Sequence, residues 1–289
     1  MRANPEFIGM PKEFWASVRT VSEKAGYTDG DGFLLPSPEV LVRTFESLDL
    51  DPTDLVIDRR FTEAGQRLAD YMRYRGDVLV NQVRGWLMNV AEAEELYRQM
   101  ADRYRPTSKQ PRNNQGKAKG APRYFTCIIN MLVESVVGLD CDYDPQQLTA
   151  VTVGRKPLRT LARRVDGAYP SAVNPIALWE IKEYYHTTTF GSRVADGVYE
   201  SLLDGMELEE MREHTQVNVL HYLMVDAKDN WWERGRSYLC RMVDMLHMGY
   251  VDEVLFGREV VDRLPALAAE WKGLRPVAEA RSREHRPML

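Results

Sequence analysis

Apolar residues recur at helical spacing through the N-terminal part of the chain. The pattern predicts helices over residues 12–25, 38–48, 62–75 and 77–105. Ser37 before Pro38 is a typical pair of N-cap and first helical residue, and Thr53 and Thr62 are candidate caps for other helices. We therefore expect a separate helical region over residues 1–105.

Residues 106–122 break this pattern. They contain few apolar side chains and many turn formers, among them proline, glycine, serine and asparagine. A segment of this composition cannot bury enough apolar surface to fold by itself. We expect a basic, flexible loop that becomes ordered on DNA.

Helical and strand patterns alternate from residue 123 to residue 289. A nearly all-apolar helix is predicted over 124–137 and an apolar, β-prone strand over 176–181. One or two helices broken near Asp204-Gly205 are predicted over 190–215, followed by a strand over 216–225, a helix over 232–248 and a strand over 251–256. This order predicts an α/β fold with a mixed central β-sheet flanked by helices.

The strand over 176–181 runs directly into an unusual pair of charges. Because side chains on a strand alternate between its two faces, Glu180 and Lys182 point the same way. Burying a carboxylate and an ammonium in a central strand is costly unless something pairs with them. If Asp166 lies on the adjacent antiparallel strand, its carboxylate meets that of Glu180, and the two give hard oxygen ligands of the kind that Mg²⁺ prefers.

An aspartate followed by a Glu-x-Lys triplet in a strand resembles the active-site signature of the PD-(D/E)xK nucleases, the superfamily that includes many type II restriction endonucleases. The resemblance covers roughly the C-terminal half of the chain, where the predicted elements follow the order of that superfamily's core. Val165 departs from the pattern, which usually has proline there. The resemblance implies a restriction-endonuclease-like core over 123–289, with Asp166, Glu180 and Lys182 as catalytic residues.

The resemblance also implies a Mg²⁺ site, with Mn²⁺ as an expected substitute. Asp166 and Glu180 are the expected ligands, and the backbone carbonyl of Ile181 is a further one. Glu134 matches the place of a glutamate that many of these nucleases carry on the helix before the first core strand, although a solvent-facing helix edge explains it equally well. Lys182 is expected to orient or deprotonate the attacking water, through either a depressed pKa or a direct hydrogen bond.

Charge along the chain bears on the substrate. The formal net charge is −5, but binding to a polyanion depends on where the charges lie. Two basic runs without any acid, over 103–123 and 155–164, flank the candidate site and favour phosphate contact. Ser192 and Arg193 open a predicted helix, whose N-terminus favours an anion. The candidate DNA-binding residues are Lys109, Arg112, Lys117, Lys119, Arg155, Lys156, Arg163, Arg164, Ser192 and Arg193.

Other chemistries find little support. Cys127, Cys141 and Cys240 are widely spaced, which indicates neither a disulfide framework nor a zinc knuckle and fits a reducing cytoplasm. No apolar run approaches the length needed to span a bilayer, so no membrane association is expected. The histidines lack metal-ligand spacing, and no phosphate-cradling glycine loop predicts a bound nucleotide triphosphate. Asp226-Ala227-Lys228 repeats the Asp-x-Lys spacing, but its turn-like surroundings rank it below Glu180-Ile181-Lys182.

The sequence thus predicts a Mg²⁺-dependent endodeoxyribonuclease of restriction type that acts on double-stranded DNA. By the same resemblance, the protein is expected to be a homodimer, with the N-terminal helices serving target recognition or dimerisation. Two alternatives stay open. One is a protein with a nuclease-like fold that binds nucleic acid without cutting it, and the other is a nuclease for repair or for RNA.

Overall fold

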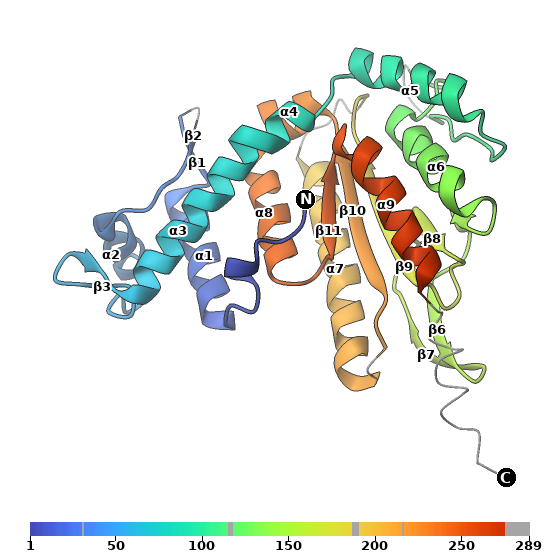
Figure 1. Ribbon diagram of the computed structural model, residues 1–289. Helices are drawn as coiled ribbons and strands as arrows, with labels where there is room; N and C mark the ends of the chain where they lie inside the picture. The colour runs from blue at the N-terminus through green and yellow to red at the C-terminus, as the bar shows by residue number, and fades with distance from the viewer. Residues whose placement is uncertain (31, 115–117, 187–190, 216, 275–289) are drawn as a thin grey trace, which may run out of the picture.

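The computed structural model describes the chain apart from residues 31, 115–117, 187–190, 216 and 275–289 and the side chains of residues 192 and 193 (Figure 1). Helices dominate its N-terminal part, which extends to the left of the sheet in Figure 1. This part contains the 3₁₀-helix η1 (Pro5–Phe7), α1 (Lys12–Ala25), α2 (Pro38–Glu46) and α3 (Glu63–Val78), with the short strand pairs β1 (Thr28–Asp29) with β2 (Gly32–Phe33) and β3 (Val56–Ile57) with β4 (Arg60–Phe61).

Two of the predicted caps are confirmed. The Ser37 hydroxyl accepts a hydrogen bond of 3.3 Å from the Val40 amide at the start of α2. The Thr62 hydroxyl accepts one of 3.1 Å from the Gly65 amide at the start of α3. Thr53 instead lies in a turn, where its amide donates to the Asp51 carboxylate, so its predicted role as a cap is wrong.

The single helix predicted over 77–105 is wrong. α3 runs into the π-helical turn η2 (Leu79–Val83) and the short α4 (Arg84–Trp86), after which the backbone becomes extended at Leu87. A new helix, α5 (Val90–Tyr104), then starts from a capping box in which the side chains of Asn89 and Glu92 each bond the other's backbone amide. These reciprocal bonds stabilise a helix start inside a segment whose apolar spacing is continuous.

The C-terminal part is built on a mixed five-stranded sheet in the order β11-β10-β9-β8-β5. β9 pairs in parallel with β10 and β10 in parallel with β11, whereas β8 is antiparallel to β9 and to β5. A separate hairpin pairs β6 with β7. The strands are β5 (Asp142–Tyr143), β6 (Ala150–Val153), β7 (Lys156–Thr160), β8 (Gly167–Tyr169), β9 (Ala177–Glu183), β10 (Leu220–Asp226) and β11 (Glu253–Phe256).

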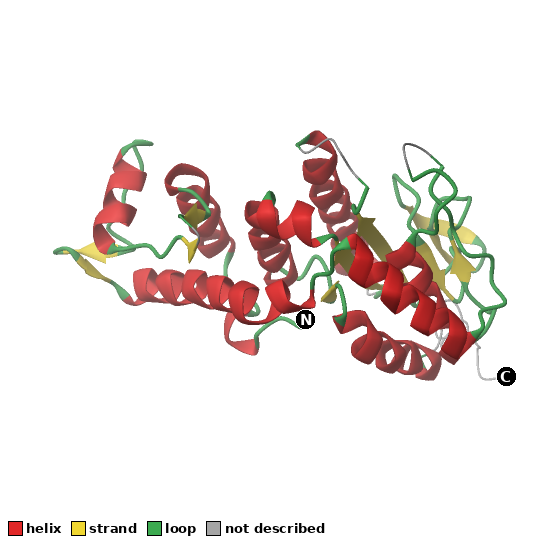
Figure 2. Ribbon diagram, turned by 90° about the horizontal axis from the view of Figure 1, so that it is seen from above, coloured by secondary structure: helices red, strands yellow, loops and turns green. Residues whose placement is uncertain are grey.

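Helices cover both faces of this sheet, as Figures 1 and 2 show. Trp179 and Ile181 of β9 belong to a core that includes α6 (Tyr124–Val137) and α9 (Glu259–Gly273). On the opposite face, Leu223 of β10 packs into a core that includes α7 (Ser192–Thr215) and α8 (Arg236–His247). A π-helical turn, η3 (Asp229–Glu233), links β10 to α8. The predicted α/β class with a mixed sheet is confirmed.

α7 is one unbroken helix of 24 residues, so the break predicted near Asp204-Gly205 is absent. Gly205 serves packing instead, because a Cβ there would lie 2.3 Å from the backbone oxygen of Tyr250. The glycine therefore lets α7 approach the residues before β11 closely. Asp204, the residue before Gly205, is fully buried.

A buried ion pair joins the N-terminal helices to the sheet domain. Arg75 of α3 donates to both carboxylate oxygens of Asp244 on α8, at 3.0 and 2.9 Å, and also to the Ser22 hydroxyl at 3.1 Å. The Tyr71 hydroxyl donates to the same carboxylate at 2.7 Å. Arg75 is only 1% exposed, and replacing one partner of such a pair leaves an uncompensated charge in the interior.

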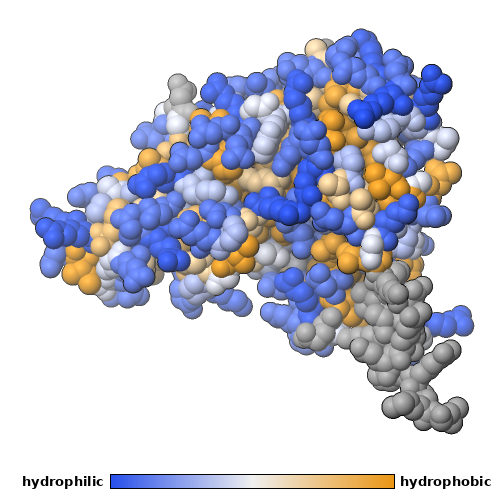
Figure 3. Space-filling model, in the orientation of Figure 1, coloured by the Kyte–Doolittle hydropathy of each residue, from blue (hydrophilic) through white to orange (hydrophobic). Residues whose placement is uncertain are grey.

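The surface is mixed in character. On the face shown in Figure 3, hydrophilic residues cover much of the N-terminal part, and hydrophobic residues lie between them in smaller groups. Among the described residues, no helix is both long enough and apolar enough to cross a bilayer.

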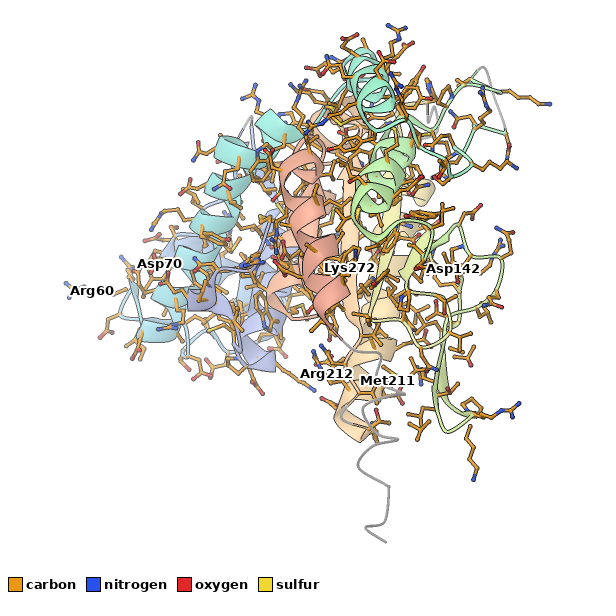
Figure 4. The ribbon with its side chains drawn as sticks, turned by 45° about the vertical axis from the view of Figure 1, so that its right-hand side comes forward. Arg60, Asp70, Asp142, Met211, Arg212 and Lys272 are labelled. Atoms are coloured by element: carbon orange, nitrogen blue, oxygen red, sulfur yellow. The ribbon has the colours of Figure 1, made fainter. Side chains whose placement is uncertain are left out.

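Replacing Arg75 with methionine is expected to lower the free energy of unfolding by about 3–5 kcal/mol, because Asp244 then stays buried without its cation. Arg73→Met is the matched control, since Arg73 pairs with Asp70 at the surface near the outer end of the N-terminal helices (Figure 4). Its loss is expected to cost less than about 1 kcal/mol. Urea unfolding followed by circular dichroism measures both, and equal losses would contradict the anchoring role of Arg75.

His221 of β10 gives the fold a dependence on pH. The ring is 2% exposed, and its Nδ1 lies 2.9 Å from the Tyr250 carbonyl. Burial lowers the pKa of His221 from 6.5 to about 4, although this hydrogen bond and the Glu180 carboxylate oppose the shift. As the pH falls, His221 is therefore protonated near pH 6.5 in the unfolded chain but only near pH 4 in the folded protein.

The stability that His221 contributes is therefore complete above pH 6.5 and is lost as the pH falls from 6.5 towards 4. Between these limits the wild type is expected to lose about 3 kcal/mol more than the His221→Gln variant. His214→Gln, at an exposed position of α7, serves as the control and is expected to follow the wild type. Urea unfolding at a series of pH values measures the free energy of unfolding of each protein. An equal loss in wild type and His221→Gln between pH 6.5 and 4 would contradict this role of His221.

Candidate functional site

The register of β8 and β9 brings the predicted aspartate and glutamate together. Gly167 pairs with Trp179 across the antiparallel pair, and the Asp166 amide, just before β8, donates to the Trp179 carbonyl at 3.1 Å, which places Asp166 beside the Trp179–Glu180 step of β9. The Ile181 amide donates a hydrogen bond of 2.7 Å to Asp166 Oδ2. Because the N–H and C=O of one strand residue point to the same side, the Ile181 carbonyl also faces Asp166.

Glu180 and Lys182 lie on the face of the sheet that α7 covers, and both are buried, with 3% and 4% of their surface exposed. The Lys182 ammonium donates to Glu180 Oε1 and to Glu200 Oε2 of α7, each at 2.7 Å. Gly197 makes this approach possible, because a Cβ there would lie 2.5 Å from the Tyr184 hydroxyl and 3.2 Å from Lys182 Cδ. A bare helix surface at Gly197 thus leaves room for the lysine side chain.

Arg163 completes the cluster from the link between β7 and β8. Its Nη2 donates to Glu180 Oε1 at 2.6 Å, and its Nη1 donates to Asp204 Oδ2 at 2.6 Å. The Glu200 carboxylate lies 3.4 Å from the same guanidinium. Arg163 was predicted as a DNA-binding residue, and the structure places it within the cluster that contains Glu180 and Lys182.

Sequence reasoning missed the acids that α7 contributes. Gly197, Glu200 and Asp204 follow one another at intervals of three and four residues and therefore share one helix face. The sequence does contain a signal for this site: two acids and a glycine share one face of the helix that follows the Glu-x-Lys strand. The expected helix break at Asp204-Gly205 obscures it, because residues on either side of a break do not share a face.

The pKa values of the acids in the cluster are shifted in different directions. Burial raises the pKa of Asp166 to about 6, and the nearby Glu180 carboxylate adds to this shift. Burial also raises the pKa of Glu180, but the Lys182 ammonium and the Arg163 guanidinium outweigh it, so the pKa of that carboxyl is lowered. Burial raises the pKa of Asp204 to about 7, against the opposing effect of Arg163. Three acids, Glu180, Glu200 and Asp204, thus contact two cations, Lys182 and Arg163. A further cation bound there would favour the ionised forms of Asp166 and Asp204.

Lys182 is held as an ammonium. Burial alone lowers its pKa, but the Glu180 carboxylate and the hydrogen bond to Glu200 outweigh burial and raise it above its ordinary value. Lys182 was expected to act on the attacking water through either a depressed pKa or a direct hydrogen bond. Its surroundings favour the second way, as a charged hydrogen-bond donor.

The donor set fits a hard divalent cation. Glu180 Oε2 is buried and has no hydrogen-bond partner among the described residues, which leaves a carboxylate oxygen of the predicted ligand available. Asp166, just before β8, and the carbonyl of Ile181, on β9 itself, provide further oxygen donors. As they stand, however, the described residues include no group of three or more His, Cys, Asp or Glu side chains that could hold a metal ion.

Glu134 is not brought to this cluster. It lies on α6, which packs on the Trp179 and Ile181 face of β9 rather than on the Glu180 face. Its carboxylate accepts hydrogen bonds from the backbone amides and hydroxyls of Thr107 and Ser108. The prediction that Glu134 reaches the metal is therefore corrected: this residue fixes the start of the basic loop to α6.

The basic residues fall into two exposed groups. Those in the link between α5 and α6 are Lys109, Arg112 and Lys119, and those around the β6–β7 hairpin and just after it are Arg155, Lys156 and Arg164. Lys117, and the side chains of Ser192 and Arg193, lie outside the described part. Arg123, where the first group ends, acts electrostatically on both Asp166 and Glu183. The first basic run thus ends near Asp166.

Asp226 of the competing Asp-x-Lys triplet has a structural role. Its carboxylate accepts hydrogen bonds of 2.8 Å from the Met88 and Ala227 amides and another from the Tyr185 hydroxyl. The Lys228 amide in turn donates to the Met88 carbonyl at 2.8 Å. These bonds fasten the segment between α4 and α5 to the end of β10.

Two surface hollows lie away from this cluster. One, of about 330 Å³, is lined by residues of α1, α7 and α8, including Tyr199 and Arg241, and by Tyr27, which follows α1. The other, of about 390 Å³, lies beside β5 and includes Asp142, whose position Figure 4 marks. Glu180 and Lys182 line neither hollow, so they are closed off in this state of the protein.

Comparison with known proteins places the chain in a family without indicating its chemistry. A search of curated proteins found no match, and a search of solved structures found none either. Residues 1–82 match the family model described as Domain of unknown function (DUF7690), and residues 88–271 match that described as Domain of unknown function (DUF7687). Because the second model covers more than half of the chain, the protein belongs to the DUF7687 family.

Proposed function

We propose that the protein is a Mg²⁺-dependent endonuclease that hydrolyses phosphodiester bonds in DNA. The observation that carries this proposal is that the Asp166 carboxylate, held at 2.7 Å by the amide of Ile181, lies next along β9 to Glu180, whose carboxylate is 2.7 Å from the Lys182 ammonium. Two carboxylates and a lysine in this arrangement resemble the active site of the PD-(D/E)xK nucleases. The mixed sheet between helices is compatible with that superfamily's core.

Each residue has a role that follows from its contacts. Asp166 and Glu180 would hold the cation, and the Ile181 carbonyl would add a third oxygen. Mg²⁺ bound there supplies positive charge that offsets the negative charge building on the phosphate in the transition state. Lys182, kept charged by its two carboxylate partners, donates hydrogen bonds to the attacking water or to the phosphate and so orients them.

The choice of DNA rests on the distribution of basic side chains. Exposed lysines and arginines occur in the link before α6 and around the β6–β7 hairpin, the two segments that precede the site in the chain. Such contacts supply affinity for a phosphate backbone independent of its sequence. The N-terminal helices would then serve recognition or dimerisation, and a homodimer of restriction type would cut both strands.

One observation favours a second function. Glu180 and Lys182 are buried and bonded to Arg163 and Glu200, so the cluster is also an ion-pair network. A protein that binds nucleic acid through its basic segments without cutting it has the same network as a structural element. Cleavage assays separate the two functions.

Plasmid DNA and an RNA, each incubated with Mg²⁺ and then with excess EDTA, test the proposal. We expect metal-dependent DNA cleavage that falls by at least about 100-fold in Glu180→Gln and in Lys182→Ala, because each removes a group that acts on the reacting phosphate. DNA binding is expected to survive in both. Discrete bands would favour a restriction-type enzyme, whereas a smear would favour a repair or degradative enzyme.

The matched controls are Glu213→Gln, at an exposed position of α7, and Lys272→Ala, on α9 at the other face of the sheet (Figure 4). Both are expected to cleave like the wild type. Thermal unfolding of every variant shows whether a loss of cleavage reflects a loss of fold. Undiminished cleavage in folded Glu180→Gln and Lys182→Ala would refute the proposed site, and DNA binding without any cleavage would favour the second function.

A further inference from the structure

Arg163 occupies a distinctive position in the acidic cluster. It lies on the link between β7 and β8, outside both strands, and 23% of its side chain is exposed. The two acids that it bonds most closely, Glu180 and Asp204, are 3% and 0% exposed. The guanidinium therefore lies between two buried carboxylates and the solvent.

In each of these two acids, one carboxylate oxygen accepts hydrogen bonds from the described residues and the other does not. Glu180 Oε1 accepts from both Lys182 and Arg163, whereas its Oε2 is buried without a partner. Asp204 Oδ2 accepts from Arg163, whereas its Oδ1 is likewise buried and unpartnered. Each acid thus uses one oxygen for Arg163 and keeps lone pairs that no group in the described structure satisfies.

A divalent cation at Glu180 would compete with Arg163. Both are attracted by the same carboxylate, and neutralising that carboxylate removes much of the charge that holds the guanidinium in place. Once released, a guanidinium on an irregular segment is well suited to a phosphate, because its planar fork of N–H groups matches two phosphate oxygens. The neighbouring Arg164, on the same segment, is already exposed.

We propose that Arg163 closes the metal-free site as the counter-ion of Glu180 and Asp204, and that it moves to a phosphate of the substrate backbone when a divalent cation binds Glu180. This rests on the proposed nuclease function and adds to it a substrate-binding residue and the reason why Glu180 is shielded in the metal-free protein. Cation and guanidinium then exclude each other at Glu180. The presence of the cation makes Arg163 available to the nucleic acid.

The competition is measured most directly without nucleic acid, by titrating Mn²⁺ into the whole protein and following its electron paramagnetic resonance signal. Arg163→Gln is expected to bind Mn²⁺ about tenfold more tightly than the wild type, because the cation no longer displaces a charge-assisted hydrogen bond. Arg159→Gln is the matched control. Arg159 also ties its segment to α7, and among the described residues its ion pairs are with Glu207 and Glu210 rather than with Glu180.

A second measurement follows the released guanidinium. With Ca²⁺ present, Arg163→Gln is expected to bind a short DNA duplex about tenfold more weakly than the wild type, whereas without divalent cations the two should bind alike. Arg163→Lys keeps the positive charge but not the fork, so it is expected to bind both Mn²⁺ and duplex with intermediate affinity. It also keeps the test available if Arg163→Gln does not fold.

The outcomes distinguish the two proposals. Mn²⁺ binding that is equal in wild type, Arg163→Gln and Arg163→Lys, or weaker in the variants, would overturn the role of Arg163 and leave the proposed metal site standing. Absence of Mn²⁺ binding in every protein would overturn both proposals. A duplex affinity that depends on Arg163 equally with and without divalent cations would refute its metal-linked release.

Discussion

The pairing of β8 with β9 is the constraint on which the candidate site depends. It brings Asp166 against β9, where the Ile181 amide, next to Glu180, bonds its carboxylate, and the period of two along β9 sets Lys182 beside Glu180. Buried carboxylates need cations, and this need explains why Lys182 and Arg163 converge on one oxygen of Glu180. The same need makes the cluster a place where a divalent cation competes with side chains.

The two sides of the sheet are used differently. The face that carries Trp179 packs a hydrophobic core against α6 and α9. The opposite face combines a hydrophobic core under α8 with the charged cluster under α7. Buried polar contacts also connect the N-terminal helices to this framework, through Arg75 with Asp244 and through Asp226 with the Met88 amide. These contacts fix α8 and the end of β10 to the part of the chain that precedes the sheet.

Local pattern was enough to predict some of this arrangement and not the rest. Alternation along a strand predicts that Glu180 and Lys182 share a face, and the helix over α6 is recognisable because nearly every residue is apolar. Which face of the sheet α6 covers is a tertiary choice, so Glu134 could be placed on α6 but not relative to Glu180. Likewise Arg163 and Asp204 are 41 residues apart, and only the docking of α7 brings them together. Gly205 looked like a helix breaker because a glycine used for close packing has the same sequence signal.

A crystal structure of the protein with Mn²⁺, with the ion located by its anomalous scattering, tests the central claim most directly. We expect one peak between the carboxylates of Asp166 and Glu180, with the guanidinium of Arg163 turned away from Glu180. An ion bound elsewhere, or a fully occupied Arg163–Glu180 ion pair at saturating Mn²⁺, would contradict the proposed metal site and leave the cluster as a structural ion-pair network.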